Sequence, residues 1–197
     1  NLDKVLDRAI AARKNKEVVS IAYDGNIVDL WERVVERNIH IEIGSDQTSL
    51  HNPWAGGYYP VGMSYEAANE MMVNNPEQFK KEVQKTLIRH THAINTLSKR
   101  GMYFFDYGNA FLLESSRAGA DILNEKGDFK YPSYVQDIMG PMCFDYGFGP
   151  FRWVCSSNDA KDLAITDQIA CDVLEKIMQH SPAEIKLQMS DNINWIK

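Results

Sequence analysis

The sequence contains few cysteines, and their pattern argues against a disulfide framework and against a zinc site. Its three cysteines, Cys143, Cys155 and Cys171, are an odd number without Cys-x-x-Cys spacing. This usage fits a reducing compartment, so we expect a cytoplasmic protein. His90 and His92 are two residues apart, which places them on different faces of a helix. We therefore predict no metal site.

Long apolar runs and runs of like charge are absent as well. No apolar stretch approaches the roughly 18 residues that a membrane-spanning helix needs, and the first residues show no signal-peptide pattern, so we expect no membrane partner. The net charge of −6, without a block of like charges, argues against a nucleic-acid surface. With 197 residues, 44% of them hydrophobic, the chain is long enough to bury a sizeable core.

The first 43 residues alternate between helical and strand patterns. Apolar residues recur at helical spacing over residues 2–10 and 28–35, whereas residues 18–23 and 40–43 indicate strands, the first of them buried. This order predicts parallel strands joined by right-handed crossovers, as in a doubly wound α/β sheet. Because two parallel strands are too few for a sheet covered on both faces, we expect the chain to contain only part of that sheet.

A long loop, residues 44–63, follows the second predicted strand. Structureless loops of this length are usually functional, and ligands of open α/β sheets bind beyond the carboxyl ends of the strands. Residues 46–51 are rich in short hydrogen-bonding side chains that suit ribose, phosphate or carboxamide groups. Asp, Ser and Thr are also common capping and turn residues, so the same segment could simply introduce the next helix.

Regular elements return after this loop. The patterns predict helices over residues 64–73 and 76–100, a strand over 102–105 that runs into a polar turn, and a helix over 159–179. The apolar stripe expected in the core comprises Phe79, Val83, Leu87, Ile94 and Leu97 in the longer helix and Leu163, Ile169, Val173, Leu174 and Ile177 in the last one.

Residues 147–153 place a single guanidinium, that of Arg152, among the aromatic rings of Phe148, Phe151 and Trp153. Burying an unpaired charge costs several kcal/mol, so Arg152 needs a partner. That partner is either a carboxylate of this chain or an anionic ligand, and these residues alone leave both possibilities open.

Four of these segments together resemble the successive signatures of the urocanase (urocanate hydratase) family. They occur in the family's order over about residues 20–197, namely residues 46–49 with His51 and Pro53, residues 58–60, residues 105–109 and residues 147–153. The chain resembles a central fragment of the family's longer subunits, because it lacks the upstream glycine-rich turn for a dinucleotide pyrophosphate. Leu50 and residues 54–57 depart mildly from the commoner pattern, which affects loop shape more than chemistry.

The resemblance implies a fold and an activity. Residues 1–134 would form the C-terminal part of an NAD-binding Rossmann-like domain, and residues 135–197 an irregular, aromatic-rich α/β segment of the catalytic core. The full-length enzyme would be a cytoplasmic homodimer and a hydro-lyase of histidine breakdown. It would add water to urocanate to give imidazolonepropionate, with tightly held NAD⁺ as an electrophile, while the 197-residue chain alone would be inactive.

The resemblance also implies a set of site residues. By position, the NAD-contacting segments match Asn26, Ile27, Gln47, Thr48, Ser49, Leu50, His51, Tyr58, Tyr59 and Tyr107. Arg152 matches the arginine expected to bind the acrylate carboxylate of urocanate, and a bidentate clamp explains why arginine rather than lysine is used. The residue that protonates the substrate is expected to lie outside this chain.

Two other functions are weighed against this one. A conventional NAD-dependent dehydrogenase would need a catalytic acid or base beside the nicotinamide and a complete Gly-x-Gly-x-x-Gly turn, and neither is visible in the sequence. A non-catalytic domain that binds NAD or another nucleotide, or that serves assembly, is the alternative from a different class.

Overall fold

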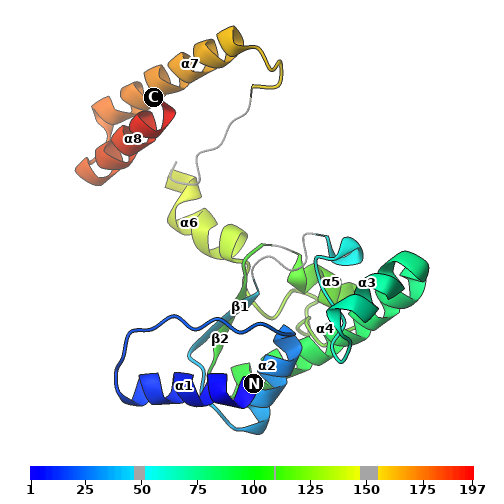
Figure 1. The fold of residues 1–197 in the computed structure, drawn as a ribbon. Helices are drawn as coiled ribbons and strands as arrows, with labels where there is room; N and C mark the ends of the chain where they lie inside the picture. Colours follow the sequence, from blue (N-terminus) through cyan, green and yellow to red (C-terminus); the bar gives the residue numbers. More distant parts are fainter. Residues whose placement is uncertain (47–51, 109, 147–154) are drawn as a thin grey trace. The chain divides into compact units, whose positions relative to one another are not determined.

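The computed structural model describes residues 1–46, 52–108, 110–146 and 155–197 (Figure 1). These residues form two compact units, Asn1–Ile138 and Met139–Lys197, each with its own hydrophobic core. None of the helices built from the described residues combines the length and the apolar character that crossing a membrane requires.

The first unit opens with two helices, α1 (Leu2–Lys14) and α2 (Ile27–Glu36), both in agreement with the helical spacing of their sequences. The side-chain oxygen of Asn26 caps α2 by accepting the backbone N–H of Val28 at 2.9 Å. Three apolar residues of α2, Val28, Trp31 and Val34, are buried in the core. Each buried side chain of this kind contributes about 1.5–3 kcal/mol, so packing stabilises this short helix more than its propensity does.

The predicted buried strand at residues 18–23 is wrong. The structure has irregular chain there, and Val18 is fully exposed at 102% of its reference area, with Val19 at 43% and Ile21 at 39%. A strand is stable only when a neighbouring strand pairs with its backbone groups, and among the described residues none pairs with this segment. The β-branched composition that suggested a strand cannot by itself supply that partner.

The sheet consists of β1 (Ile43–Asp46) and β2 (Tyr103–Asp106), which pair in parallel with Ile43 opposite Tyr103 and Asp46 opposite Asp106. The predicted α/β class with parallel strands is therefore confirmed, and β2 lies within one residue of its predicted position. The strand predicted at residues 40–43 is shifted in the structure, because β1 begins at Ile43, three residues later than predicted. Gly44 allows β1 to lie close to Met102, because a Cβ at residue 44 would lie 2.8 Å from the Met102 sulfur.

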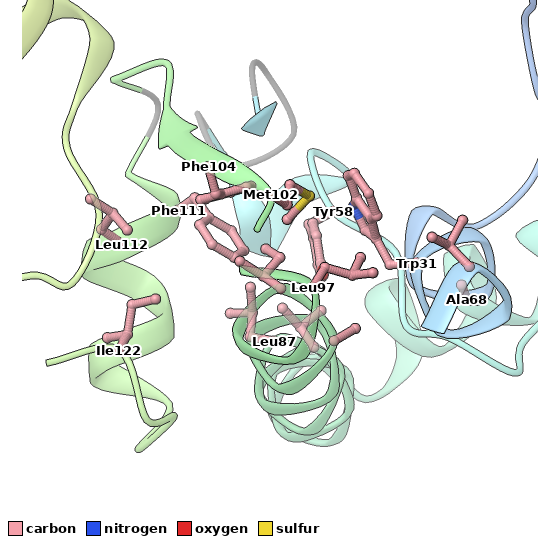
Figure 2. Packing of buried hydrophobic residues seen from close by; sticks show 14 of the residues in the cluster. Trp31, Tyr58, Ala68, Leu87, Leu97, Met102, Phe104, Phe111, Leu112 and Ile122 are labelled. Atoms are coloured by element: carbon pink, nitrogen blue, oxygen red, sulfur yellow. The ribbon is translucent and has the colours of Figure 1, made fainter. Parts of the chain in front are cut away.

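The crossover between the strands contains a 3₁₀ turn, η1 (Pro53–Ala55), and the helices α3 (Tyr65–Asn74) and α4 (Pro76–Lys99). Asn75 caps α4 by accepting the N–H of Gln78, and Pro76 occupies the first turn, as the sequence predicts. All five core residues predicted for this helix are buried, and Figure 2 shows α4 against Met102, Phe104 and Phe111.

The carboxyl end of β2 leads into a short helix that the sequence pattern did not predict, α5 (Phe111–Arg117). The Asp106 carboxylate accepts the N–H of Leu112 at 3.0 Å and also that of Gly108, so it caps this helix from the strand end. An antiparallel bridge between Leu123 and Phe129 follows, and the π-helical segment η2 (Tyr134–Met139) runs to the boundary of the unit.

The second unit contains α6 (Gly140–Met142), the 3₁₀ turn η3 (Phe144–Tyr146), α7 (Ala160–His180) and α8 (Ala183–Ile196). The sequence predicts α7 within one residue at each end, whereas α8 was not predicted. The described core of this unit is small, formed by Cys171 and Leu174 of α7 and by Met189 and Ile193 of α8.

The inward face predicted for α7 is largely wrong. Leu174 is buried as expected, but the other four residues are 42–56% exposed: Leu163, Ile169, Val173 and Ile177. Apolar residues extend around more than one face of α7. Among the described elements α8 is its main neighbour, and α8 buries only the face turned toward it.

Candidate functional site

The two parallel strands end side by side on a pair of aspartates. Asp46 and Asp106 face each other in register and are both buried, with 6% and 3% of their surface exposed. The backbone N–H of Tyr107 donates to the carbonyl of Asp46 at 3.0 Å. The last residue of β1 therefore lies directly beside Tyr107, at the edge where open α/β sheets bind ligands.

Tyr107 presents an aromatic surface at this edge. Its side chain is 42% exposed, and its ring stacks on that of Tyr134 with centroids 5.0 Å apart and planes 9° apart. The row continues along β2 through Phe105, which also contacts Tyr134, to the exposed Tyr103. Flat rings held in this way can stack against a planar heteroaromatic group of a ligand.

Asn26 and Tyr59 meet although they are 33 residues apart in the sequence. The Asn26 side-chain amide donates to the Tyr59 carbonyl at 3.0 Å, while its oxygen caps α2. A pocket of about 260 Å³ adjoins this contact and is lined by Asp24, Gly25, Asn26, Tyr59, Met63 and Tyr65. Ile27, the neighbouring predicted site residue, is partly buried against the core of the unit.

Tyr58 faces the core, unlike Tyr59. Its side chain is 3% exposed, and its hydroxyl lies 2.9 Å from Nδ1 of His90 in α4. Burial raises the pKa of Tyr58 well above its usual value of 10, and the nearby Asp46 carboxylate raises it further. Burial also lowers the pKa of His90 to about 3, so the imidazole stays neutral at physiological pH.

Sequence reasoning considered His90 only as a possible metal ligand and missed this contact. The two histidines do lie on different faces of α4, as predicted, with His90 buried and His92 exposed. The spacing Val83, Leu87, His90, Ile94 is that of one helix face, and this signal could have placed His90 in the core. Within the described ranges, no group of three or more His, Cys, Asp or Glu side chains is arranged to hold a metal ion.

A wider pocket, of about 800 Å³, opens beside the carboxyl end of β2. Its lining includes the three carboxylates Asp106, Asp128 and Asp137, and its one cationic side chain, Lys130, is paired with Asp121. Asp106 and Asp137 accept backbone N–H groups within the unit. This acidic lining does not suit the pyrophosphate of a dinucleotide, and none of the predicted site residues that the structure describes lines it.

The remaining predicted site residues lie outside the residues that the structure describes. These are Gln47, Thr48, Ser49, Leu50 and His51 of the loop after β1, and Arg152 of the aromatic segment. The choice between an internal ion pair and an anionic ligand for Arg152 therefore stays open on geometric grounds.

The described residues fit separate parts of a dinucleotide. The pocket beside Asn26 and Tyr59 lies near the lower limit of the roughly 300–1,000 Å³ usual for ligand pockets, so it suits one ring or one sugar at a time. The polar residues Asp24 and Asn26 are among those that line this pocket, and the Tyr107–Tyr134 stack supplies a planar surface at the sheet edge.

Comparisons with known proteins cover almost the whole chain. Residues 1–138 match the family profile described as the urocanase Rossmann-like domain, and residues 141–197 match that described as the urocanase C-terminal domain. The chain is 53% identical to urocanate hydratase of Mus musculus and 51% identical to urocanate hydratase of Homo sapiens, in both cases over its entire length. It is 57% identical, over 93% of its length, to a probable urocanate hydratase of Dictyostelium discoideum. The chain spans only 28–30% of the length of these three relatives.

Proposed function

The chain belongs to the urocanase family, and from that premise we propose that it forms part of a urocanate hydratase. This enzyme would add water to urocanate and give imidazolonepropionate. The observation that carries the proposal is the match of the entire chain, at more than half identity, to urocanate hydratases of two mammals. Because the chain spans about 30% of those relatives, the activity is proposed for the full-length protein.

The proposed cofactor is NAD⁺, which when bound supplies an electrophilic ring to the reaction. Asn26 and Tyr59 would hold one group of the cofactor in the pocket that adjoins their hydrogen bond. Tyr107 would stack against a planar group at the sheet edge. Residues 47–51, which follow Asp46 in the chain, would complete the contacts from the loop. The Rossmann-like family profile and the parallel sheet edge support this assignment.

Arg152 is the proposed partner of the substrate carboxylate. A guanidinium presents two parallel N–H donors to a carboxylate, and neighbouring aromatic side chains that exclude water would strengthen that pair. By fixing the carboxylate end of urocanate, Arg152 would orient the substrate without itself exchanging protons, because its own pKa is far above physiological pH.

The two halves of the chain would serve these two tasks. We assign residues 1–134 to the dinucleotide-binding domain and residues 135–197 to the catalytic core. Two compact units that meet at Ile138 and Met139, and two family profiles that meet nearby, support a division in this region. For the full-length protein a cytoplasmic homodimer is proposed from the family resemblance alone.

The test uses the full-length protein, purified and denatured to release any bound nucleotide. We expect stoichiometric NAD⁺ in the released fraction and loss of urocanate absorbance with the native enzyme, without accumulation of NADH. Net accumulation of NADH with substrate would indicate a dehydrogenase instead. Bound NAD⁺ without turnover of urocanate would indicate a non-catalytic nucleotide-binding domain, and absence of both would contradict the proposal altogether.

A further inference from the structure

The segment 58–61 is fastened to helix α4 at two buried points. The hydroxyl of Tyr58 lies 2.9 Å from Nδ1 of His90, and the backbone N–H of Val61 donates to Oγ1 of Thr86 at 3.1 Å. Thr86 and His90 are four residues apart on one face of α4, and only 2% and 1% of their surfaces are exposed. The two contacts therefore bracket the segment from its core side.

Both anchoring side chains are themselves held in place. The Thr86 hydroxyl donates to the carbonyl of Glu82 at 2.8 Å, which turns its lone pairs toward Val61. The His90 ring packs edge-on against Phe111, with centroids 4.8 Å apart, and lies nearly parallel to the ring of Tyr58. Figure 2 shows Tyr58 and Phe111 among the buried side chains around α4. The anchor is thus part of the rigid core and not a surface contact.

The anchored segment reaches the proposed cofactor site through Tyr59. The carbonyl of Tyr59 accepts the amide of Asn26 at 3.0 Å, and its hydroxyl donates to Asn69 at 3.0 Å. Tyr58 and Val61 flank Tyr59 and Pro60, so fixing the two outer residues fixes the position of the Tyr59 carbonyl between them. A continuous chain of bonds therefore runs from the interior of α4 to the pocket beside Asn26.

We propose that Thr86 and His90 are positioning residues of the NAD⁺ site, which set the affinity for the cofactor by holding residues 58–61 in their binding geometry. This inference rests on the proposed function. A binding segment that is ordered before the ligand arrives does not have to be ordered by it, and this preorganisation appears as tighter binding. Neither residue needs to touch the cofactor to have this effect.

Helix α4 offers matched controls for both residues. Thr91 is as deeply buried as Thr86, but its hydroxyl has no hydrogen-bond partner among the described residues, so Thr91→Val removes the same atom without removing an anchor. His92 lies two residues from His90 and is exposed, so His92→Phe repeats the chemistry of His90→Phe away from the core. Thr86→Ser retains the hydroxyl that Thr86→Val removes.

The experiment measures how fast bound NAD⁺ exchanges with labelled NAD⁺ in the full-length protein, together with the melting temperature. Affinity differences between related complexes appear mostly in dissociation, so Thr86→Val and His90→Phe should each accelerate exchange by about 3- to 30-fold. The Thr91→Val and His92→Phe proteins should exchange NAD⁺ at the wild-type rate. The Thr86→Ser protein, which keeps the hydroxyl, should exchange NAD⁺ much more slowly than Thr86→Val and close to the wild-type rate. At saturating NAD⁺, the kcat of the variants should change less than their exchange rate.

Two results would overturn this inference and leave the proposed function intact. Thr86→Val protein that melts lower but exchanges NAD⁺ at the wild-type rate would show a purely structural role. Equal acceleration by Thr91→Val would show that any loosening of α4 has the same effect. If His90→Phe does not fold, Thr86→Val decides, because Val and Thr have nearly the same shape. Wild-type protein that carries and binds no NAD⁺ would instead refute the proposed function, and this inference with it.

Discussion

Acidification from about pH 7 to about pH 5 is expected to destabilise the first unit through His90. The imidazole is buried in the core between Tyr58 and Phe111, and burial lowers its pKa from the usual 6.5 to about 3. In the unfolded chain the same ring titrates near 6.5. As the pH falls below that value the unfolded state takes up a proton that the folded state refuses, so the equilibrium shifts toward unfolding.

The size of the effect follows from the separation of the two pKa values. A lowered folded-state pKa means that the stabilisation is complete above about pH 6.5 and is lost progressively as the pH falls toward 3. At about pH 5 the loss amounts to about 2 kcal/mol, at 1.36 kcal/mol per pH unit. The ion-paired carboxylates Asp3 and Glu32, whose pKa values are lowered mainly by hydrogen bonds from Arg33 and Arg89, respond only at lower pH. These two carboxylates therefore contribute little to the loss between pH 7 and pH 5.

Urea unfolding of the 197-residue chain at both pH values, followed by tryptophan fluorescence, measures this loss, since Trp31 is buried in the same core. His90→Gln should be less stable than wild type at pH 7 but should lose about 2 kcal/mol less between pH 7 and pH 5. His92→Gln, which changes an exposed histidine of the same helix, should keep the wild-type slope. Equal pH dependence in wild type and His90→Gln would refute the reasoning.

Three further predictions concern the substrate, the sheet and the second unit. In the full-length enzyme, Arg152→Ala should lower kcat/KM for urocanate by about 30- to several thousand-fold, equivalent to about 2–5 kcal/mol, while bound NAD⁺ and melting temperature are retained. Arg152→Lys should recover part of the lost kcat/KM. A lower melting temperature with unchanged kcat/KM would identify a structural ion pair. Gly44→Ala should destabilise the first unit by about 1–3 kcal/mol in urea unfolding, because the alanine Cβ would lie 2.8 Å from the Met102 sulfur. Unchanged stability would show that Met102 repacks freely. Because large exposed apolar faces favour association, we expect the 197-residue chain to self-associate through α7, where Ile165 and Ile169 are 58% and 56% exposed. Replacing both residues by lysine should reduce this association in sedimentation, and unchanged association would place the contact elsewhere.

Sequence patterns located helices accurately where one face carries a regular apolar stripe. The five apolar residues predicted for the core of α4 are all buried, and its Asn75–Pro76 start is that expected from the capping rules. The pattern failed where burial depends on a partner remote in the sequence. Residues 18–23 have the composition of a strand but no pairing strand among the described residues, and α7 has more apolar surface than α8 covers.

The candidate site shows the same limit at the level of single side chains. Strand ends that run into polar residues predicted the sheet edge, and the structure has Asp46 and Tyr107 side by side there. The adjacent tyrosines could not be told apart by sequence, because they are the same residue type and lie in a loop without a periodic apolar pattern. Tyr58 takes the core side since His90, 32 residues later, offers a buried nitrogen to its hydroxyl, which leaves Tyr59 to line the pocket with Asn26. A buried polar group on a helix face thus decides which of the two tyrosines faces the core and which lines the pocket.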